Sequence, residues 1–362
     1  MQEELSFKEL QEMVSICLDE LVKIKKENGE LKQSLSELST LLKDLYAEEL
    51  KLSGKVVVID SDKEKMKAAL RNLKYELGDL THQGSEWYFP KFFELEDTME
   101  RIIRGKKSMA RFGDGEFSIM VGEERPKFQK PDKKLAERLI QVIQSKEERF
   151  LVAIADNYGS LQSYNEEAKC GIRSYMTDEV RRQHRKFLNL ERKYHNAYVS
   201  RPYVIYADND TAAPAKRFQL LKRIWDGRKV LFVEGALTRM GVGNDLFDNA
   251  AQIRRIEAPS VNAFDKYDEI LEAALQHAQE DTLILIALGP AAGVLAYDLY
   301  CAGLQAIDIG HVDLEYEWYL RKAGGRCEVK YKYNNEYEGG DSVEDIYDEE
   351  YESQIIADLS KG

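Results

Sequence analysis

Cysteine is scarce in this 362-residue sequence, with four copies in the whole chain. Cys17, Cys170, Cys301 and Cys327 are widely separated, and no two of them have the Cys-x-x-Cys spacing. A disulfide framework needs a denser set of cysteines in a shorter chain, so the sequence predicts reduced thiols.

Long apolar runs and an excess of basic residues are also missing. No stretch approaches the ~18 uncharged apolar residues that a membrane helix requires, so no membrane span is expected. The first four residues, Met-Gln-Glu-Glu, do not resemble the basic start of a secretory signal, which favours a cytoplasmic protein. The formal net charge of −13 argues against a nucleic-acid partner, because neutralising phosphates needs a basic face.

Much of the negative charge lies near the end of the sequence. Residues 336–362 contain ten acidic residues and one lysine. Such crowding predicts a solvated acidic tail. The alternative is a short docking helix, for which the segment offers five apolar or aromatic side chains: Tyr347, Tyr351, Ile355, Ile356 and Leu359.

Apolar residues with heptad spacing fill the N-terminal part of the sequence. Between residues 10 and 45 every core position except Asn28 is apolar, which predicts a coiled coil over residues 1–52. Asn28 can pair with its counterpart only in a parallel, in-register dimer, so a homodimer is expected. An intramolecular hairpin with a helix over residues 63–80 is the alternative.

Residues 53–86 are predicted to be a linker with a strand-like run and a helix. The apolar run that begins at Lys55 ends in Asp60 and Asp62, a pattern also found at metal sites of one large class of glycosyltransferases and in aspartyl phosphatases. In that class a nucleotide-binding half-domain precedes the motif, whereas here a coiled coil does. Lys63 stands where the phosphatases have Ser or Thr, so a linker is preferred.

Residues 87–335 alternate strand-length apolar runs with amphipathic helical stretches, which predicts βαβ units. The expected fold class is α/β, with a single Rossmann-like, largely parallel sheet. The seven expected strands cover residues 108–112, 150–155, 203–206, 229–234, 255–258, 282–288 and 306–309. Ligands of such sheets bind beyond the carboxyl ends of the strands, so the segments after the strands are the candidate sites.

Two carboxylates follow the first expected strand. Asp114 and Glu116 lie on a segment made pliable by Gly113 and Gly115, and carboxylates so spaced can converge on Mg²⁺ or Mn²⁺. A metal held there would neutralise a diphosphate. An Asp-Gly turn without any ligand is the alternative.

Glycines follow the fourth expected strand, which ends at Glu234. Backbone amides at Gly241, Gly243 and Asn244 can approach a diphosphate closely, and a helix expected to begin near Asn244 would direct its positive dipole end at the same group. Arg239 would add guanidinium donors. A glycine-rich loop with a helix cap at Asn244 is the alternative.

The ends of the sixth and seventh expected strands carry further candidates. Gly289 and Pro290 open a helix, either beside the base or ribose of a nucleotide or for tight packing of helix on strand. His311 lies at the sheet edge beside a row of acidic residues, among them Asp313. A structural histidine is the alternative.

Four stretches of the sequence together resemble one known family. They are ARFGDGEF at 110–117, GVGNDLFDNA at 241–250, ALGPAAGVLAYDL at 287–299 and QAIDIGHVDLEYEW at 305–318. The chain is similar in them to the bacterial glycosyltransferases of the GT-D fold, formerly a domain of unknown function. That family is related to the streptococcal glucosyltransferase that extends glycans on serine-rich-repeat adhesins.

The resemblance implies a UDP-sugar donor, often UDP-glucose, and a divalent metal held by an Asp-x-Glu motif, which falls on Asp114 and Glu116. Where family members commonly have Thr-Ala-Thr after the Gly-Pro pair, this chain has Ala-Ala-Gly at 291–293 and lacks the hydroxyls. The expected donor-binding residues are Arg111, Glu234, Arg239, Gly241, Gly243, Asn244, Gly289 and Pro290. The candidates for a base at the acceptor hydroxyl are His311, Asp313 and Glu315.

The sequence therefore predicts a metal-dependent glycosyltransferase. It would transfer a hexose, with glucose expected first, from a UDP-sugar to a glycan or glycoprotein acceptor. The alternative is a non-catalytic nucleotide-binding scaffold that works through its coiled coil. A dehydrogenase is disfavoured, because no Gly-x-Gly-x-x-Gly fingerprint follows the first strand.

Overall fold

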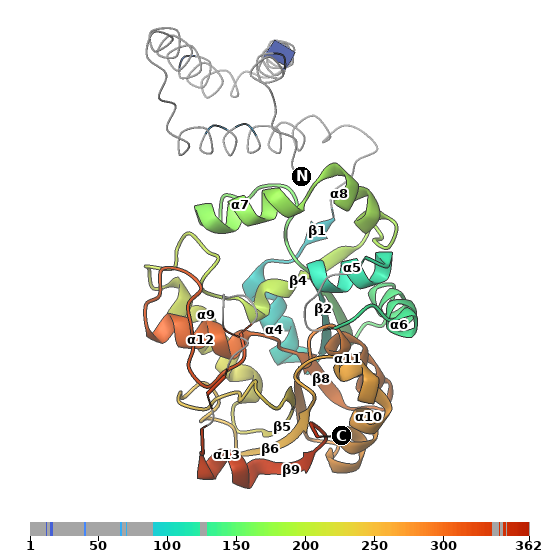
Figure 1. Cartoon of the computed structure of the whole chain (residues 1–362), viewed down its shortest axis with the longest axis vertical. Helices are drawn as coiled ribbons and strands as arrows, with labels where there is room; N and C mark the ends of the chain where they lie inside the picture. The colour runs from blue at the N-terminus through green and yellow to red at the C-terminus, as the bar shows by residue number, and fades with distance from the viewer. Residues whose placement is uncertain are drawn as a thin grey trace. The chain divides into compact units, whose positions relative to one another are not determined.

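The computed structural model describes residues 90–123, 129–334, 340, 343–344 and 346–361, and the isolated positions 12, 15, 16, 40, 66 and 70 (Figure 1). The chain divides into two compact units, Met1–Thr81 and His82–Gly362. The predicted coiled coil with Asn28, its dimer, and the Asp60 and Asp62 pair lie outside the described residues and stay predictions. None of the described helices combines the length and the apolar character that crossing a bilayer requires.

The second unit is built on one parallel sheet. In the described part of the chain its nine strands follow the order β1-β4-β3-β2-β8-β7-β5-β6-β9, and every pairing is parallel. The strands are β1 (Lys91–Phe92), β2 (Ser108–Phe112), β3 (Phe150–Ile154), β4 (Lys193–Asn196), β5 (Lys229–Gly235), β6 (Gln252–Ala258), β7 (Leu283–Ala287), β8 (Gln305–Asp308) and β9 (Ile355–Asp358).

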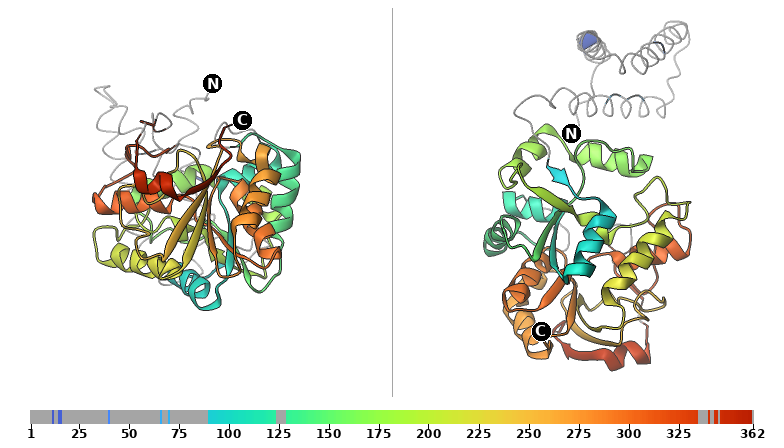
Figure 2. Two further views of the ribbon diagram at one scale, coloured as in Figure 1. Left: turned by 90° about the horizontal axis from the view of Figure 1, so that it is seen from below. Right: turned by 180° about the vertical axis from the view of Figure 1, so that it is seen from behind.

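Helices cover both faces of this sheet (Figure 2). The set α6, α10 and α11 packs on one face, with α5 against α6, while α4, α9 and α12 lie on the other. The helices are α4 (Leu95–Gly105), α5 (Asp114–Val121), α6 (Lys133–Ile143), α7 (Glu166–Tyr175), α8 (Asp178–Arg185), α9 (Ala213–Trp225), α10 (Tyr267–His277), α11 (Ala291–Cys301), α12 (Val312–Leu320) and α13 (Glu349–Gln354), with 3₁₀ turns η1 (Ala197–Ser200) and η2 (Ala263–Lys266).

The central strands have the sequence expected of a doubly covered parallel sheet. In β7 the run Leu-Ile-Leu-Ile is fully buried, because helices exclude water from both faces. Helix α11 approaches the sheet closely through Gly293, where an added Cβ would lie 3.4 Å from the Cβ of Ala110 in β2. Tight helix–strand packing, one of the two alternatives for this glycine-rich segment, is thus present.

Six of the seven expected strands are found, with shifted ends, and one is wrong. Residues 203–206 form a turn. Among the described residues, its one strand-like pairing is an isolated antiparallel bridge between Tyr164 and Tyr206. These apolar residues are buried in a loop that carries its own hydrogen bonds. Strands β1 and β4 were missed because they are short and β4, Lys-Tyr-His-Asn, is largely polar.

The prediction of a solvated acidic tail is wrong for residues 348–358. Helix α13 leads into β9, which pairs with β6 at the edge of the sheet. The Tyr351 hydroxyl donates to Glu257 over 2.9 Å, and Arg255 donates to Gln354 over 2.7 Å. Apolar and aromatic side chains among the acids therefore dock this segment onto the domain, closer to the docking-helix alternative.

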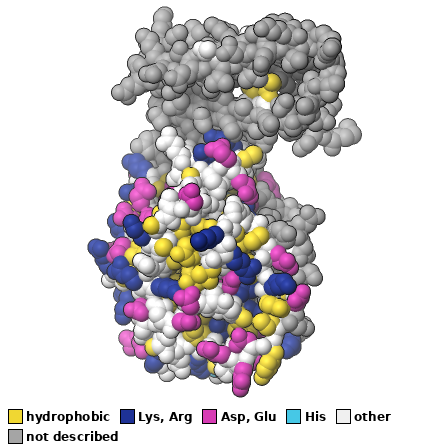
Figure 3. All heavy atoms as spheres, turned by 90° about the vertical axis from the view of Figure 1, so that its left-hand side faces the viewer, with side chains coloured by type: hydrophobic (Ala, Val, Ile, Leu, Met, Phe, Trp, Pro, Cys, Tyr) yellow, Lys and Arg dark blue, Asp and Glu magenta, His cyan; other side chains and the backbone are white. Residues whose placement is uncertain are grey.

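Acidic and basic side chains are interspersed on the face of the described domain that Figure 3 displays. The formal net charge of −13 is therefore not gathered into a field of one sign on that face. The distribution of charge on this face does not indicate a partner. The candidate site is identified from the fold instead.

Candidate active site

A pocket of about 530 Å³ opens at the carboxyl ends of β2, β3, β7 and β8. Strands β2 and β8 are neighbours, and the helices that follow them, α5 and α12, lie on opposite faces of the sheet (Figures 1 and 2). Diverging connections of this kind leave a crevice at the strand ends, where α/β proteins bind their ligands.

The pocket gathers about half of the residues that the sequence singled out. Those lining it are Arg111, Asp114, Glu116, Gly289, Pro290, His311 and Asp313. Those absent from its lining are Glu234, Arg239, Gly241, Gly243, Asn244 and Glu315. The hydrogen bonds of these residues show how each of them is engaged within the fold.

Asp114 and Glu116 occupy the first turn of α5. Gly113 is the N-cap, and the Glu116 carboxylate folds back to accept the Gly113 N–H over 2.7 Å, which satisfies one of the unpaired amides at the helix start. Negative charge is favourable there because the helix dipole is positive at this end. Burial raises the pKa of Glu116 to about 7, while Asp114 is exposed to the pocket.

This pair fits a divalent metal that shares its coordination with a substrate. Among the described residues no group of three or more His, Cys, Asp or Glu side chains forms a ready-made metal cage. Mg²⁺ is commonly held by one or two carboxylates plus substrate phosphates, and two carboxylates line the pocket. Asp114 is the accessible ligand, and Glu116 would bind through a carboxylate that already caps the helix.

Arg111 fastens the floor of the pocket. Its guanidinium lies 2.6 Å from the Asp308 carboxylate, donates to the Asp308 carbonyl over 3.1 Å and donates to the Ser200 hydroxyl over 2.6 Å. These contacts join β2, β8 and η1 at one point. Most of the Arg111 donors are thus used within the protein, where they position the strand ends, and its predicted contact with the sugar donor stays a prediction.

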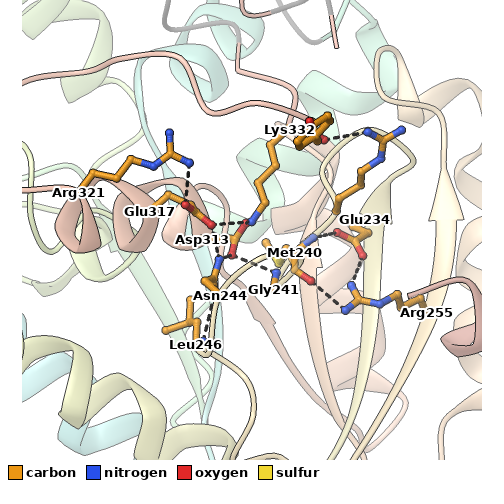
Figure 4. Close-up of polar contacts among 12 residues, drawn as sticks. Glu234, Met240, Gly241, Asn244, Leu246, Arg255, Asp313, Glu317, Arg321 and Lys332 are labelled. Atoms are coloured by element: carbon orange, nitrogen blue, oxygen red, sulfur yellow. Dashed lines mark hydrogen bonds and ion pairs between the residues drawn. The ribbon is translucent and has the colours of Figure 1, made fainter. Parts of the chain in front are cut away.

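The turn at residues 241–244 binds protein carboxylates (Figure 4). Gly241 N–H and the Asn244 side-chain amide donate to Asp313 Oδ1 over 3.0 and 2.9 Å, and the Asn244 amide also reaches Glu317 over 2.8 Å. The structure continues in turns through residue 250, so the expected helix dipole is missing. The Gly241 and Asn244 donors face α12, and the predicted contact of this turn with the diphosphate stays a prediction.

Asp313 and Glu315 are anchors of the fold. The Lys332 ammonium lies 2.5 Å from Asp313 and 3.4 Å from Glu317, and all three side chains are buried (Figure 4). Glu315 is fully buried and accepts the N–H groups of Tyr203 and Val204 over 3.0 and 2.9 Å. Asp313 and Glu315 are thus engaged within the fold, and their role as bases stays a prediction. His311, at the N-cap of α12, lines the pocket together with Asp313.

Glu234 and Arg239 also support turns. The Glu234 carboxylate, with no exposed surface, lies 2.5 Å from the Arg255 guanidinium and accepts the Met240 N–H over 2.9 Å (Figure 4). Arg239 adopts a positive φ of 49° and donates to the carbonyls of Tyr331 and Glu344, each over 2.9 Å. Neither residue lines the pocket, and their predicted contacts with the sugar donor stay predictions.

The pocket also contains residues that the sequence did not single out. Tyr198 donates a short hydrogen bond to Asn157, and both side chains line the pocket. Asn157 comes just after β3, so inspection of every strand end would have found it. Arg201 and Arg326 line the same pocket from segments without a strand, where the sequence carries no signal.

Comparison with known proteins identifies the family. A family model described as "Glycosyltransferase GT-D fold" matches residues 109–337. The chain belongs to this family. A solved structure described as "The highly conserved domain of unknown function 1792 has a distinct glycosyltransferase fold" aligns with 36% identity and a TM-score of 0.70, over 75% of this chain and 96% of that one.

Two streptococcal proteins extend this comparison. The GT-D domain resembles "A New Glycosyltransferase (DUF1792) from Streptococcus sanguinis" with 34% identity and a TM-score of 0.68, over 75% of this chain and 100% of that one. It is also 37% identical over 266 residues to "Glycosyltransferase GlyD" of Streptococcus pneumoniae serotype 4, covering 73% of this chain and 32% of that protein. The chain spans about a third of the length of the curated relatives it matches.

A buried histidine of the GT-D domain packs against α5, the helix that carries Asp114 and Glu116. The His184 ring stacks on Phe117 of α5 with ring centroids 3.7 Å apart. Its Nδ1 lies 2.6 Å from the Tyr158 hydroxyl and its Nε2 lies 3.0 Å from the Tyr175 hydroxyl. Because Tyr175 lines the pocket, this cluster links α5 with the α7 wall.

Asp156, beside the pocket residue Asn157, makes the stability of the GT-D domain depend on pH. Burial, followed by the Glu94 carboxylate, raises its pKa from 3.8 to about 7. The folded protein therefore takes up a proton, so the free energy of unfolding falls between about pH 4 and pH 7 and stays low above. Asp156→Asn should raise the free energy of unfolding by about 2 kcal/mol near pH 8 and leave it unchanged below about pH 4.

Urea unfolding at both pH values measures this effect, with the exposed Asp248→Asn as the control. A gain of equal size at both pH values would contradict the titration and indicate a packing effect.

Proposed function

We propose that this GT-D domain transfers a hexose, with glucose expected first, from a UDP-sugar to a glycan or glycoprotein acceptor, with the help of Mn²⁺ or Mg²⁺. The observation that carries the proposal is the exposed Asp114 carboxylate, at the start of α5 in a pocket at the β2 and β8 strand ends. The family match supports the transfer reaction, and the chemistry of the pocket supports the metal.

The charges of the pocket favour a divalent cation. Three lining residues have ion-pair partners in the fold: Arg111 with Asp308, Asp313 with Lys332 and Arg326 with Glu167. The lining also includes the acids Asp114, Glu116 and Glu123 and the base Arg201. A nucleoside diphosphate would add further negative charge, so a metal between it and the carboxylates relieves the repulsion.

A bound metal would stabilise the negative charge that develops on the departing diphosphate. The chain itself would orient the donor along the strand ends, with Gly289 and Pro290 in van der Waals reach of it. His311 is the residue proposed to accept the proton of the acceptor hydroxyl, since Asp313 and Glu315 are engaged elsewhere.

Asp114→Asn tests the proposal. The variant is expected to lose UDP-sugar turnover by about 100-fold or more, because the accessible metal ligand is gone, while its melting temperature stays close to that of the unaltered protein. The measurement is UDP release from a panel of UDP-sugars, with and without Mn²⁺.

The matched control is Asp97→Asn, which removes an exposed acid from the first turn of α4, outside the pocket. Undiminished turnover in Asp114→Asn would refute the metal assignment. Binding of UDP without turnover of any UDP-sugar by the unaltered chain would favour the scaffold alternative.

A further inference from the structure

Two arginines of the pocket have no role in the function proposed so far. Arg201 follows η1 on the β4 side, and Arg326 lies on the segment after α12, so they reach the pocket from elements far apart in the sequence. The turn that was expected to bind the diphosphate faces Asp313 instead, and Arg111 is held by Asp308 and Ser200. Arg201 and Arg326 add positive charge to the pocket wall.

Tyr198 lines the pocket together with Arg201, Arg326 and Asp114. Burial raises the pKa of Tyr198, while the charges of Arg201 and Arg326 lower it and those of Asp156 and Asp114 raise it. A diphosphate in this pocket would meet arginine side chains as well as a metal held by the carboxylates.

Arg326 has a carboxylate partner at the rim of the pocket. Its guanidinium lies 3.9 Å from Glu167 in the first turn of α7, with 35% of the Arg326 and 66% of the Glu167 side chain exposed. Exposed pairs at such a distance contribute little to stability, so Arg326 can leave Glu167 readily. Gly324 and Gly325 precede Arg326 and give the backbone freedom for this change.

We propose that Arg201 and Arg326 form a clamp on the diphosphate of the donor, and that Arg326 exchanges Glu167 for the diphosphate when the donor binds. The fork of N–H donors on each guanidinium suits phosphate oxygens. The inference rests on the proposed use of a nucleoside diphosphate donor. The clamp adds two residues that bind the phosphates of the donor. It also adds the contact between Arg326 and Glu167, which competes with the binding of the phosphates.

The test measures binding of UDP and of uridine to the full chain by calorimetry, with Mn²⁺ present and at constant ionic strength. Arg201→Gln and Arg326→Gln should each weaken UDP binding by about 10-fold to 100-fold, because each removes charged hydrogen bonds to phosphate. Uridine binding should not change. Glu167→Gln should strengthen UDP binding by about twofold to fivefold, because Arg326 loses its competing partner.

The matched control is Arg182→Gln, which removes an arginine paired with Glu179 on α8, outside the pocket. UDP binding unchanged in both arginine variants, or no UDP binding by the unaltered chain, would overturn the clamp. Equal weakening of UDP and uridine would also overturn it. The clamp and the proposed function fail separately: Arg-dependent UDP binding without UDP-sugar turnover refutes the function, and turnover with Arg-independent binding refutes the clamp.

Discussion

Replacing Lys332 with methionine is expected to lower the free energy of unfolding by about 3–5 kcal/mol. The Lys332 ammonium lies 2.5 Å from Asp313 and 3.4 Å from Glu317, and no more than 8% of any of these side chains is exposed. Methionine keeps most of the volume but removes the cation that Asp313 and Glu317 share, and Glu317 keeps its contact with Arg321 at 3.0 Å. The charge left on the buried Asp313 is costly because water cannot solvate it.

Chemical denaturation measures the loss, and a second substitution tests its cause. Lys332→Met combined with Asp313→Asn should regain part of the stability, because the charge left on Asp313 is removed. The exposed Lys330→Met, two residues away, serves as the control and should change stability by less than about 0.5 kcal/mol. A loss below about 1 kcal/mol in Lys332→Met would show that the cluster does not hold α12 in place.

Gly310→Ala is expected to destabilise the domain by about 3 kcal/mol or more and to remove UDP-sugar turnover. Gly310 has a positive φ of 48°, and a Cβ there would lie 2.0 Å from the Arg111 Nη2 atom. Arg111 would have to leave Asp308, which breaks a largely buried ion pair and releases the end of β2 from that of β8. Asp114 lies two residues beyond the end of β2, so its carboxylate would lose its position as well.

Gly303→Ala is the matched control for this variant. Gly303 also has a positive φ, 87°, but a Cβ there meets nothing within 4 Å. It should therefore cost only the backbone strain, about 1–2 kcal/mol, and leave turnover unchanged. Equal losses in the two variants, measured by thermal unfolding and UDP release, would show that the Arg111 contact adds nothing.

Local sequence was sufficient for the central strands and for the place of Asp114. Buried parallel strands are continuous apolar runs, and ligands gather at their carboxyl ends, so both follow from neighbouring residues. The acceptor of the backbone amides in the turn at Gly241 could not be predicted in this way. A Gly-x-Gly-Asn turn looks the same whether its amides meet a phosphate or a protein carboxylate, and the acceptor here, Asp313, is 72 residues away.

The prediction for residues 348–358 failed for a related reason. Acidic residues around Tyr351 suggested a solvated segment, yet β9 needs only a few apolar residues to pair at the edge of the sheet. Arg201 and Arg326, which we propose to bind the diphosphate, were missed because they lie outside any periodic pattern. Contacts between residues far apart in the sequence determine where such side chains lie, and the local composition does not record those contacts.

The Arg111–Asp308 contact also bears on the order of folding. It joins residues 197 positions apart, and β2 and β8 are adjacent in the sheet although five strands separate them in the chain. Contacts between distant residues pay a large loop-closure entropy and slow the search for the native state. The floor of the pocket therefore closes only after most of the domain has been synthesised and assembled, so Asp114 and Glu116 are present in the nascent chain well before the pocket that they line.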